Sequence, residues 1–191
     1  MLKRLLSAIS LAVVVLASQA ASAGVTIHYE GTAKDLPSAR RAIAAARAEA
    51  RKLGWVVQDA NRATVTILRV IGEAEKPYTG PLTGVVIRPH PNCDPLFLQF
   101  GSDLYLQDFV KTQFAGPDIH IAIVGLLKTL QPFFRTLSVE DEGEYWNSRN
   151  RKALTDHMNF VNNLIAGRKK ANPSARGPVR ITGDRMVDLI E

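Results

Sequence analysis

Apolar and polar residues alternate in several short segments of the chain, and this alternation is typical of β-strands with one buried face. In residues 25–29 the side chains of Val25, Ile27 and Tyr29 share one face, and His28 lies on the opposite, polar side. Similar patterns or short apolar runs predict further strands at 55–58, 64–71, 85–87, 96–100, 104–114 and 137–139. Residues 73–80 contain Pro77 and Gly80, two residue types that interrupt helices and strands, so this segment is expected to form a loop.

Apolar residues also recur every three or four positions in three longer segments, which predicts three amphipathic helices. The first helix follows Asp35, a residue type that caps helix N-termini, and ends before Gly54. The second and third helices are predicted over residues 118–130 and 150–166, and Gly167 follows the third as a C-terminal cap.

The order of these elements predicts the fold class. Helices and strands are interspersed, and four strands are consecutive in the middle of the chain. We therefore predict an α+β fold, with a mainly antiparallel sheet of about 5–7 strands and two or three helices packed on it. Residues 24–167 suit a single domain, and residues 168–191 are predicted to be a basic linker or C-terminal tail. Within that tail, residues 179–181 and 186–190 could dock back on the domain.

Residues 1–23 have the organisation of a secretory signal peptide. Lys3 and Arg4 precede an apolar run over residues 5–16, and Ala21-Ser22-Ala23 is a small-residue pattern of the kind that signal peptidase cleaves. The apolar run is too short to cross a bilayer core, which needs about 20 residues. We predict cleavage after Ala23, a secreted or periplasmic location, and no transmembrane helix in the mature chain. The Ala- and Arg-rich composition favours a bacterial source.

Charge narrows the range of partners. The net charge of +6 falls to +4 when the two basic residues of the signal are removed, which is small for a dedicated nucleic-acid-binding protein. The basic residues gather in the first helix and at residues 168–170, and neither segment contains the aromatic residues that stack on bases. We therefore do not expect nucleic acid as a partner. The sequence also lacks the motifs of phosphate-binding loops, dinucleotide sites, serine hydrolases and c-type haem.

Cys93 is the only cysteine of the chain, so no intramolecular disulfide can form. It lies near His90 in a proline-rich segment between two predicted strands, where His90 could lower the pKa of the thiol. His120, at the start of the second helix, could act as a base. Cys93, His90 and His120 are therefore candidate catalytic residues, or ligands of a divalent metal whose identity stays unknown. The alternative is that Cys93 is a small buried apolar residue. No cofactor is predicted.

A second candidate site is the acidic and aromatic segment 140–146. It could bind calcium through its carboxylates or hold a basic partner with its aromatic side chains as anchors. The alternative is a solvated acidic loop. The candidate residues for ligand or partner binding are Glu140, Asp141, Glu144, Tyr145 and Trp146.

Lys111 and Gln113 are further candidate binding residues. They share one face of a predicted strand that precedes a helix N-terminus, where anions are favoured. A strand with one wet face would produce the same pattern.

Because no complete catalytic motif is present, the leading hypothesis is a secreted or periplasmic, non-catalytic binding domain. Its partner would be a protein or a small ligand of the cell envelope. The alternative is a small hydrolase or a metal-binding protein that uses the His90–Cys93 segment together with His120.

Overall fold

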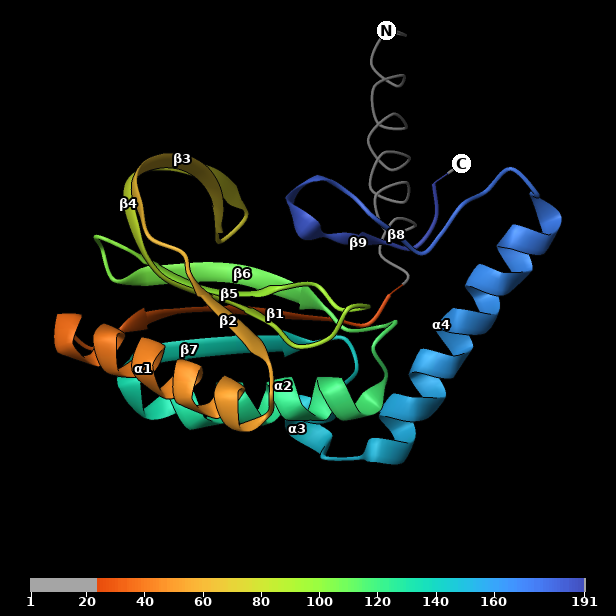
Figure 1. The fold of residues 1–191 in the computed structure, drawn as a ribbon, viewed down its shortest axis with the longest axis horizontal. Coiled ribbons are helices and arrows are strands. Elements are labelled where there is room, and N and C mark those ends of the chain that lie inside the picture. Colours follow the sequence, from red (N-terminus) through yellow and green to blue (C-terminus); the bar gives the residue numbers. More distant parts are fainter. Residues whose placement is uncertain (1–23, 191) are drawn as a thin grey trace, which may run out of the picture.

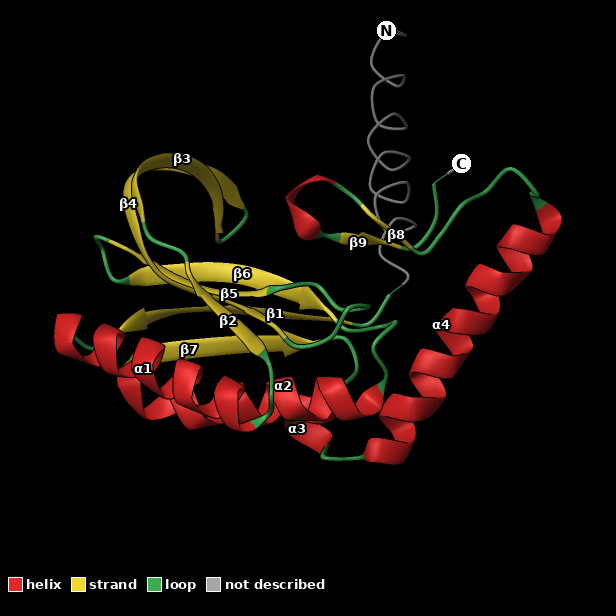
Figure 2. Ribbon diagram, viewed as in Figure 1, coloured by secondary structure: helices red, strands yellow, loops and turns green. Residues whose placement is uncertain are grey.

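The structure is a computed structural model that describes residues 24–190, so the predicted signal peptide lies outside the described residues. Within residues 24–190 the chain forms four α-helices and nine β-strands, and every strand pairing is antiparallel. This confirms the predicted α+β class (Figures 1 and 2).

A three-stranded sheet contains the first strand of the described chain and forms one side of the core. Its strands, in order across the sheet, are β6 (Tyr105–Lys111), β1 (Thr26–Ala33) and β7 (Phe134–Asp141). As the alternation in β1 predicts, Ile27 and Tyr29 are buried on one face. The intervening residues His28 and Glu30 therefore belong to the other face.

A four-stranded sheet adjoins the first one. Its strands are β2 (Val56–Asp59), β3 (Arg62–Ile71), β4 (Ala74–Arg88) and β5 (Leu96–Gly101). The second half of β4 pairs with both β2 and β5, whereas its first half pairs with β3 alone. As a result β3 and the first half of β4 form a two-stranded ribbon that extends away from the sheet and over β6 (Figure 1).

The prediction of a loop over residues 73–80 is wrong, because most of this segment belongs to β4. The turn of the ribbon is confined to its tip, where Gly72 has a positive φ of 64°. Pro77 is tolerated because β4 has only one partner strand here, so a residue without an N–H group can face the open edge.

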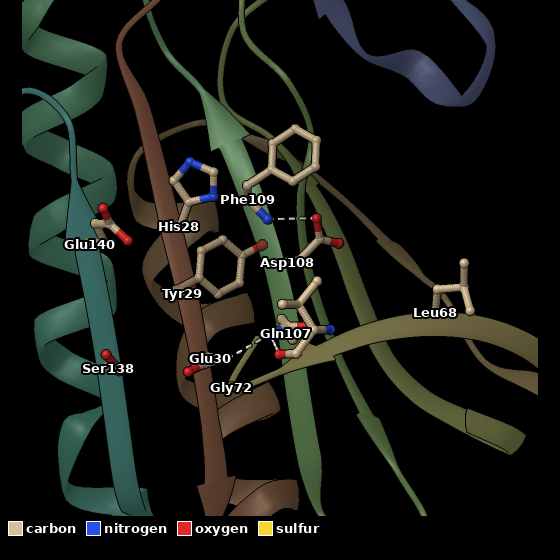
Figure 3. A pocket seen from close by; sticks show the side chains of 11 residues that line it. His28, Tyr29, Glu30, Leu68, Gly72, Gln107, Asp108, Phe109, Ser138 and Glu140 are labelled. Atoms are coloured by element: carbon tan, nitrogen blue, oxygen red, sulfur yellow. Dashed lines mark hydrogen bonds between the residues drawn. The ribbon is translucent and has the colours of Figure 1, made fainter. Parts of the chain in front are cut away.

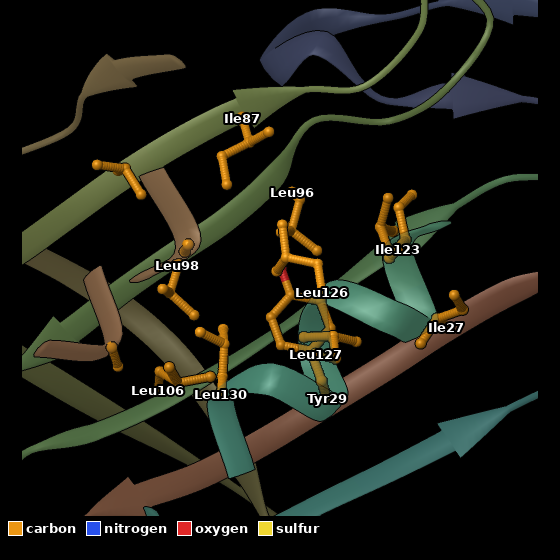
Figure 4. Packing of buried hydrophobic residues seen from close by; sticks show 14 of the residues in the cluster. Ile27, Tyr29, Ile87, Leu96, Leu98, Leu106, Ile123, Leu126, Leu127 and Leu130 are labelled. Carbon is orange, nitrogen blue, oxygen red and sulfur yellow. The ribbon is translucent and has the colours of Figure 1, made fainter. Parts of the chain in front are cut away.

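Two helices cover one face of the three-stranded sheet (Figure 1). They are α1 (Leu36–Lys52) and α2 (Pro117–Leu130), and a short 3-10 helix, η2 (Gln131–Phe133), follows α2. Asp35 caps α1 as predicted, with its carboxylate accepting a hydrogen bond of 2.6 Å from the N–H of Ser38. The large core residues gather between α2, β1 and β5 (Figure 4): Ile27, Tyr29, Leu96, Leu98, Leu126, Leu127 and Leu130.

The last long helix begins where it was predicted but continues further. A short helix, α3 (Tyr145–Ser148), leads to α4 (Arg151–Ala171), whose N-cap is Asn150. The helix continues through Gly167 and ends after a run of basic residues, whose positive charges favour a helix C-terminus. None of the helices in residues 24–190 is long and apolar enough to span a membrane.

The segment after α4 returns to the body of the protein as a small hairpin (Figure 1). It contains β8 (Val179–Arg180), a short 3-10 helix η3 (Thr182–Asp184) and β9 (Met186–Val187). The fully buried carboxylate of Asp94 accepts hydrogen bonds from the backbone N–H groups of Met186 (2.6 Å) and Lys111 (3.1 Å). A salt bridge of 2.7 Å between Lys111 and Asp188 adds to this docking.

Candidate functional site

The structure buries Cys93 beneath the C-terminal hairpin, leaving only 2% of the residue exposed. Burial raises the pKa of the thiol to about 12, the negative charge of Asp94 adds to this rise, and Arg180 opposes it. The Nδ1 atom of His90 accepts a hydrogen bond of 3.1 Å from the backbone of Asn92. Within residues 24–190 the thiol forms no hydrogen bond with either candidate histidine. The arrangement therefore does not activate Cys93 as a nucleophile.

His120 belongs to a separate, fully buried network. Its Nδ1 atom lies 2.8 Å from the hydroxyl of Thr112, and its Nε2 atom lies 3.1 Å from the Asp141 carboxylate. This order of hydroxyl, imidazole and carboxylate resembles a catalytic relay. However, the side chains of Thr112 and His120 are completely inaccessible, so no substrate can reach the hydroxyl. The network instead connects the start of α2 to the end of β7.

The acidic and aromatic segment is divided by the fold. The side chain of Asp141 is buried, and its carboxylate accepts hydrogen bonds from the backbone N–H groups of Gly143 (2.8 Å) and Trp146 (2.7 Å). Although burial opposes ionisation, the hydrogen bond from His120 and those from the backbone lower the pKa of Asp141. Trp146 is only 8% exposed and packs beneath Lys128, whose Nζ atom lies 3.4 Å from the ring centroid.

The remaining members of this segment do not form one site. Tyr145 is half-buried against His120, and Glu144 is exposed at the start of α3. Glu140 faces a cleft on the sheet. Residues 24–190 contain no group of three His, Cys, Asp or Glu side chains that could hold a metal ion.

Lys111 and Gln113 also have structural partners. Lys111 forms the salt bridge with Asp188, and Gln113 is buried. The Gln113 amide accepts a hydrogen bond of 3.0 Å from the N–H of Val25 and donates one of 2.8 Å to the carbonyl of Met158. These bonds connect the start of β1 to α4, so neither residue presents its polar group to a ligand.

The main cleft lies on the face of the three-stranded sheet that the helices leave uncovered (Figure 3). Its volume is about 680 Å³. Two rows of side chains cross the strands and form its floor. The register of β1 with its neighbours defines these rows as Phe109–His28–Glu140 and Gln107–Glu30–Ser138.

The first row places an imidazole between an aromatic ring and a carboxylate (Figure 3). The rings of His28 and Phe109 are 5.8 Å apart, and the His28 side chain is about half exposed. The Nε2 atom of His28 lies 3.8 Å from the Glu142 carboxylate. This interaction raises the pKa of His28; partial burial opposes the rise, and the negative charges of Glu142 and Glu140 add to it.

In the second row, Glu30 is held by two neutral donors. The Tyr105 hydroxyl and the Gln107 amide each donate a hydrogen bond of 2.6 Å to the same Glu30 oxygen. Burial raises the pKa of Tyr105 well above its ordinary value, and the hydrogen bond to Glu30 adds to this rise. The phenol therefore stays protonated and remains a donor to the carboxylate.

The β3–β4 ribbon forms a roof over the cleft. Leu68 and Val70 line the cleft from above and are 66% and 51% exposed, respectively. The Gln107 amide accepts a hydrogen bond of 2.8 Å from the N–H of Val70 and donates one of 2.7 Å to its carbonyl. On the other side of β3, Arg69 is buried against the Tyr78 ring and donates a hydrogen bond of 2.5 Å to Asp103. These contacts hold the ribbon above the sheet.

The C-terminal hairpin borders one end of the cleft. Arg185 forms a salt bridge with Asp108, donates a hydrogen bond of 2.7 Å to the carbonyl of Phe109, and stacks 4.1 Å from the centroid of its ring. The positive charge of Arg185 thus neutralises the nearby Asp108, and its stacking fixes the orientation of Phe109.

Most residues of this cleft were not recognised in the sequence; of the candidates chosen there, only Glu140 lines it. The polar face of the first strand was visible as a pattern, but its neighbours across the sheet were not. Comparison of the chain with protein-family models, with curated proteins and with solved structures finds no match.

Proposed function

We propose that this protein is a secreted or periplasmic, non-catalytic binding domain whose ligand occupies the cleft between the sheet and the β3–β4 ribbon. The observation that carries the proposal is the cleft itself. Its volume of about 680 Å³ falls within the common range for small-molecule sites, roughly 300–1,000 Å³. An apolar roof faces a floor of polar groups, a combination that ligand sites use for affinity and orientation.

The exposure of the roof supports a ligand there. Leu68 and Val70 line the cleft while more than half of each residue remains exposed to water. Covering a Leu or Val side chain fully contributes about 1.5–3 kcal/mol. A ligand that fills the cleft would gain a substantial part of that free energy from each residue.

The absence of catalysis is supported by the placement of the chemically reactive groups. The Cys93 thiol has a raised pKa and is buried, and the His120 network is closed to solvent. A nucleophile and its base must be within hydrogen-bond reach of each other and of the substrate. The cleft contains a hydroxyl, Ser138, which is a diagonal neighbour of His28, but no hydrogen bond joins the two side chains within residues 24–190.

The proposed location depends on residues 1–23, whose sequence has the parts of a signal peptide. A bound ligand would then come from the cell envelope or the surrounding medium. Export can be measured directly, by fractionating cells that express the complete chain and determining the N-terminal residue of the exported product. An N-terminus at Gly24 in the envelope fraction is expected, and retention of the intact chain in the cytoplasm would contradict it.

The binding proposal is tested by a nuclear magnetic resonance screen of the isotope-labelled protein with neutral, cationic and anionic aromatic fragments. We expect the fragments that bind to shift the amide signals of His28, Gln107 and Glu140. Replacing Phe109 by Ala removes one wall, and we expect it to weaken fragment binding at least about tenfold, equivalent to 1.4 kcal/mol.

The matched control is Phe160→Ala, because Phe160 is 61% exposed on α4 and lies outside the cleft. This variant removes the same ring and should bind fragments as the unaltered protein does. Binding that is absent from the cleft, or equally weakened by both substitutions, would contradict the proposal.

A further inference from the structure

We infer that the cleft selects a small organic amine, in which a positively charged ammonium group is attached to an apolar group. This inference rests on the proposed binding function and names the chemical class of its ligand. It follows from the combination of charge, aromatic surface and size within the cleft.

Three carboxylates line the cleft, Glu30, Asp108 and Glu140, and they give it a negative character. The lining also includes the imidazole of His28, but neither Lys nor Arg. Arg185 neutralises Asp108 from the border of the cleft. When His28 is protonated, the adjacent Glu142 balances its charge.

Two of these carboxylates, Glu30 and Glu140, have no Lys or Arg partner in the described part of the chain. Glu30 accepts hydrogen bonds only from the neutral Tyr105 and Gln107. Glu140 is exposed and forms no side-chain hydrogen bond or salt bridge within residues 24–190. An anionic ligand would be repelled by both groups, whereas a cation would be attracted.

The register of the sheet places these two residues close enough to contact one ligand group. Glu30 lies directly opposite Ser138, two residues before Glu140 on β7, so Glu30 and Glu140 are diagonal neighbours. The residue positions of diagonal neighbours in an antiparallel pair are about 7–8 Å apart, within reach of long side chains, so Glu30 and the exposed Glu140 can both contact one ammonium group. Its three N–H donors can reach both groups.

The apolar part of the ligand has its own surface. Phe109 lies in the same row as Glu140 and is 39% exposed. Leu68 and Val70 line the opposite side of the cleft, on the roof. One face of the Phe109 ring already stacks on Arg185, so the ring contributes apolar surface to the cleft. A ligand with an ammonium group at one end and an apolar group at the other therefore matches the cleft.

The experiment compares three probes with the same apolar group: phenethylamine, 2-phenylethanol and 3-phenylpropionate. They carry a positive, a neutral and a negative group, respectively. Affinities are measured from the amide shifts of the cleft residues at about pH 8, above the ordinary imidazole pKa of about 6.5, which reduces the protonation of His28. We expect phenethylamine to bind at least about tenfold more tightly than the alcohol, and the anion no more tightly than the alcohol.

The variant Glu140→Gln tests whether this carboxylate binds the ammonium group. Because Glu140 is exposed, its loss should weaken phenethylamine binding about three- to tenfold and leave the affinity for 2-phenylethanol unchanged. Glu144→Gln is the matched control, because Glu144 is an exposed carboxylate of the same acidic segment but does not line the cleft. It should alter neither affinity.

The outcomes separate this inference from the binding proposal. Equal affinity for the amine and the alcohol within the cleft would overturn the inference and leave the binding function intact. Binding of none of the three probes in the cleft would overturn both. A loss of alcohol binding in Glu140→Gln as large as the loss of amine binding would show that Glu140 shapes the cleft rather than selects charge.

Discussion

The docking of the C-terminal hairpin depends on one buried carboxylate, and Asp94→Asn tests this dependence. One oxygen of Asp94 accepts the N–H of Met186 at 2.6 Å, and the other accepts the N–H of Lys111 at 3.1 Å. Arg185 lies 3.6 Å from the same carboxylate. An amide has the same shape, but it offers only one acceptor oxygen and directs an NH₂ group toward the second backbone N–H.

The magnitude follows from these contacts. A hydrogen bond to a charged group contributes about 1.5–3 kcal/mol, and an unsatisfied buried donor costs about 1–3 kcal/mol. Since one of two such bonds is lost and the other weakens, we expect a destabilisation of about 2–4 kcal/mol. That is a large part of the 5–15 kcal/mol typical of a domain.

Two measurements distinguish loss of the hairpin from loss of the whole fold. Urea unfolding, followed by tryptophan fluorescence, reports global stability, and hydrogen exchange at the Met186 amide reports docking of the hairpin. If only the hairpin opens, the exchange rate of Met186 should rise about 30- to 1,000-fold, which is the same free energy expressed as an equilibrium constant. If the two parts unfold together, the urea midpoint should fall.

Asp184→Asn serves as the control within the same hairpin. Asp184 pairs with Arg88 at 2.6 Å, but about a third of its side chain is exposed, so its loss should cost less than about 1 kcal/mol. Its φ of 68° suits Asn as well as Asp, so the backbone is not perturbed. An Asp94→Asn variant with an unchanged urea midpoint and unchanged Met186 exchange would refute the reasoning.

Two further predictions concern ionisation. Cys93, with a pKa of about 12, should react with an alkylating reagent at about pH 8 roughly a thousandfold more slowly in the folded protein than after denaturation, and rapid labelling of the native protein would contradict this. Because the pKa of Asp141 is lowered by folding, its ionised form contributes stability above the unfolded value of about 3.9, and this contribution is lost as the pH falls through the lower folded pKa. The difference in unfolding free energy between the unaltered protein and Asp141→Asn should therefore shrink in acid, and a difference that stays constant from neutral pH to about pH 3 would argue against the assignment.

The parts of the fold that depend on local interactions were predictable from the sequence. Asp35 caps its helix through a residue three positions away, and the alternation in β1 reports its own buried face. Pro77 and Gly167 were misleading because their effects depend on context. Pro77 lies in a ribbon where β4 pairs with one strand only. Gly167 does not end its helix, because the basic residues that follow it form the last turn of α4.

The candidate site was harder to predict, because its residues meet only through strand register. Sequence reasoning favoured conspicuous residue types, among them Cys93, Gln113 and Trp146, and the fold buries all three. The floor of the cleft instead combines ordinary polar side chains from three strands that are far apart in the chain. A pattern within one strand shows that His28 faces away from the core, but it contains no information about which residues lie beside it.

The side-chain amide of Gln107 takes the place of a missing strand neighbour. It exchanges two hydrogen bonds with the backbone of Val70, as an adjacent strand would, while its nitrogen also donates to Glu30 on the floor. Floor and roof therefore share one connecting group, and lifting the ribbon would break both bonds to Val70. The width of the cleft and the hydrogen bonding of Glu30 are consequently thermodynamically linked: a ligand that changes either one changes the other.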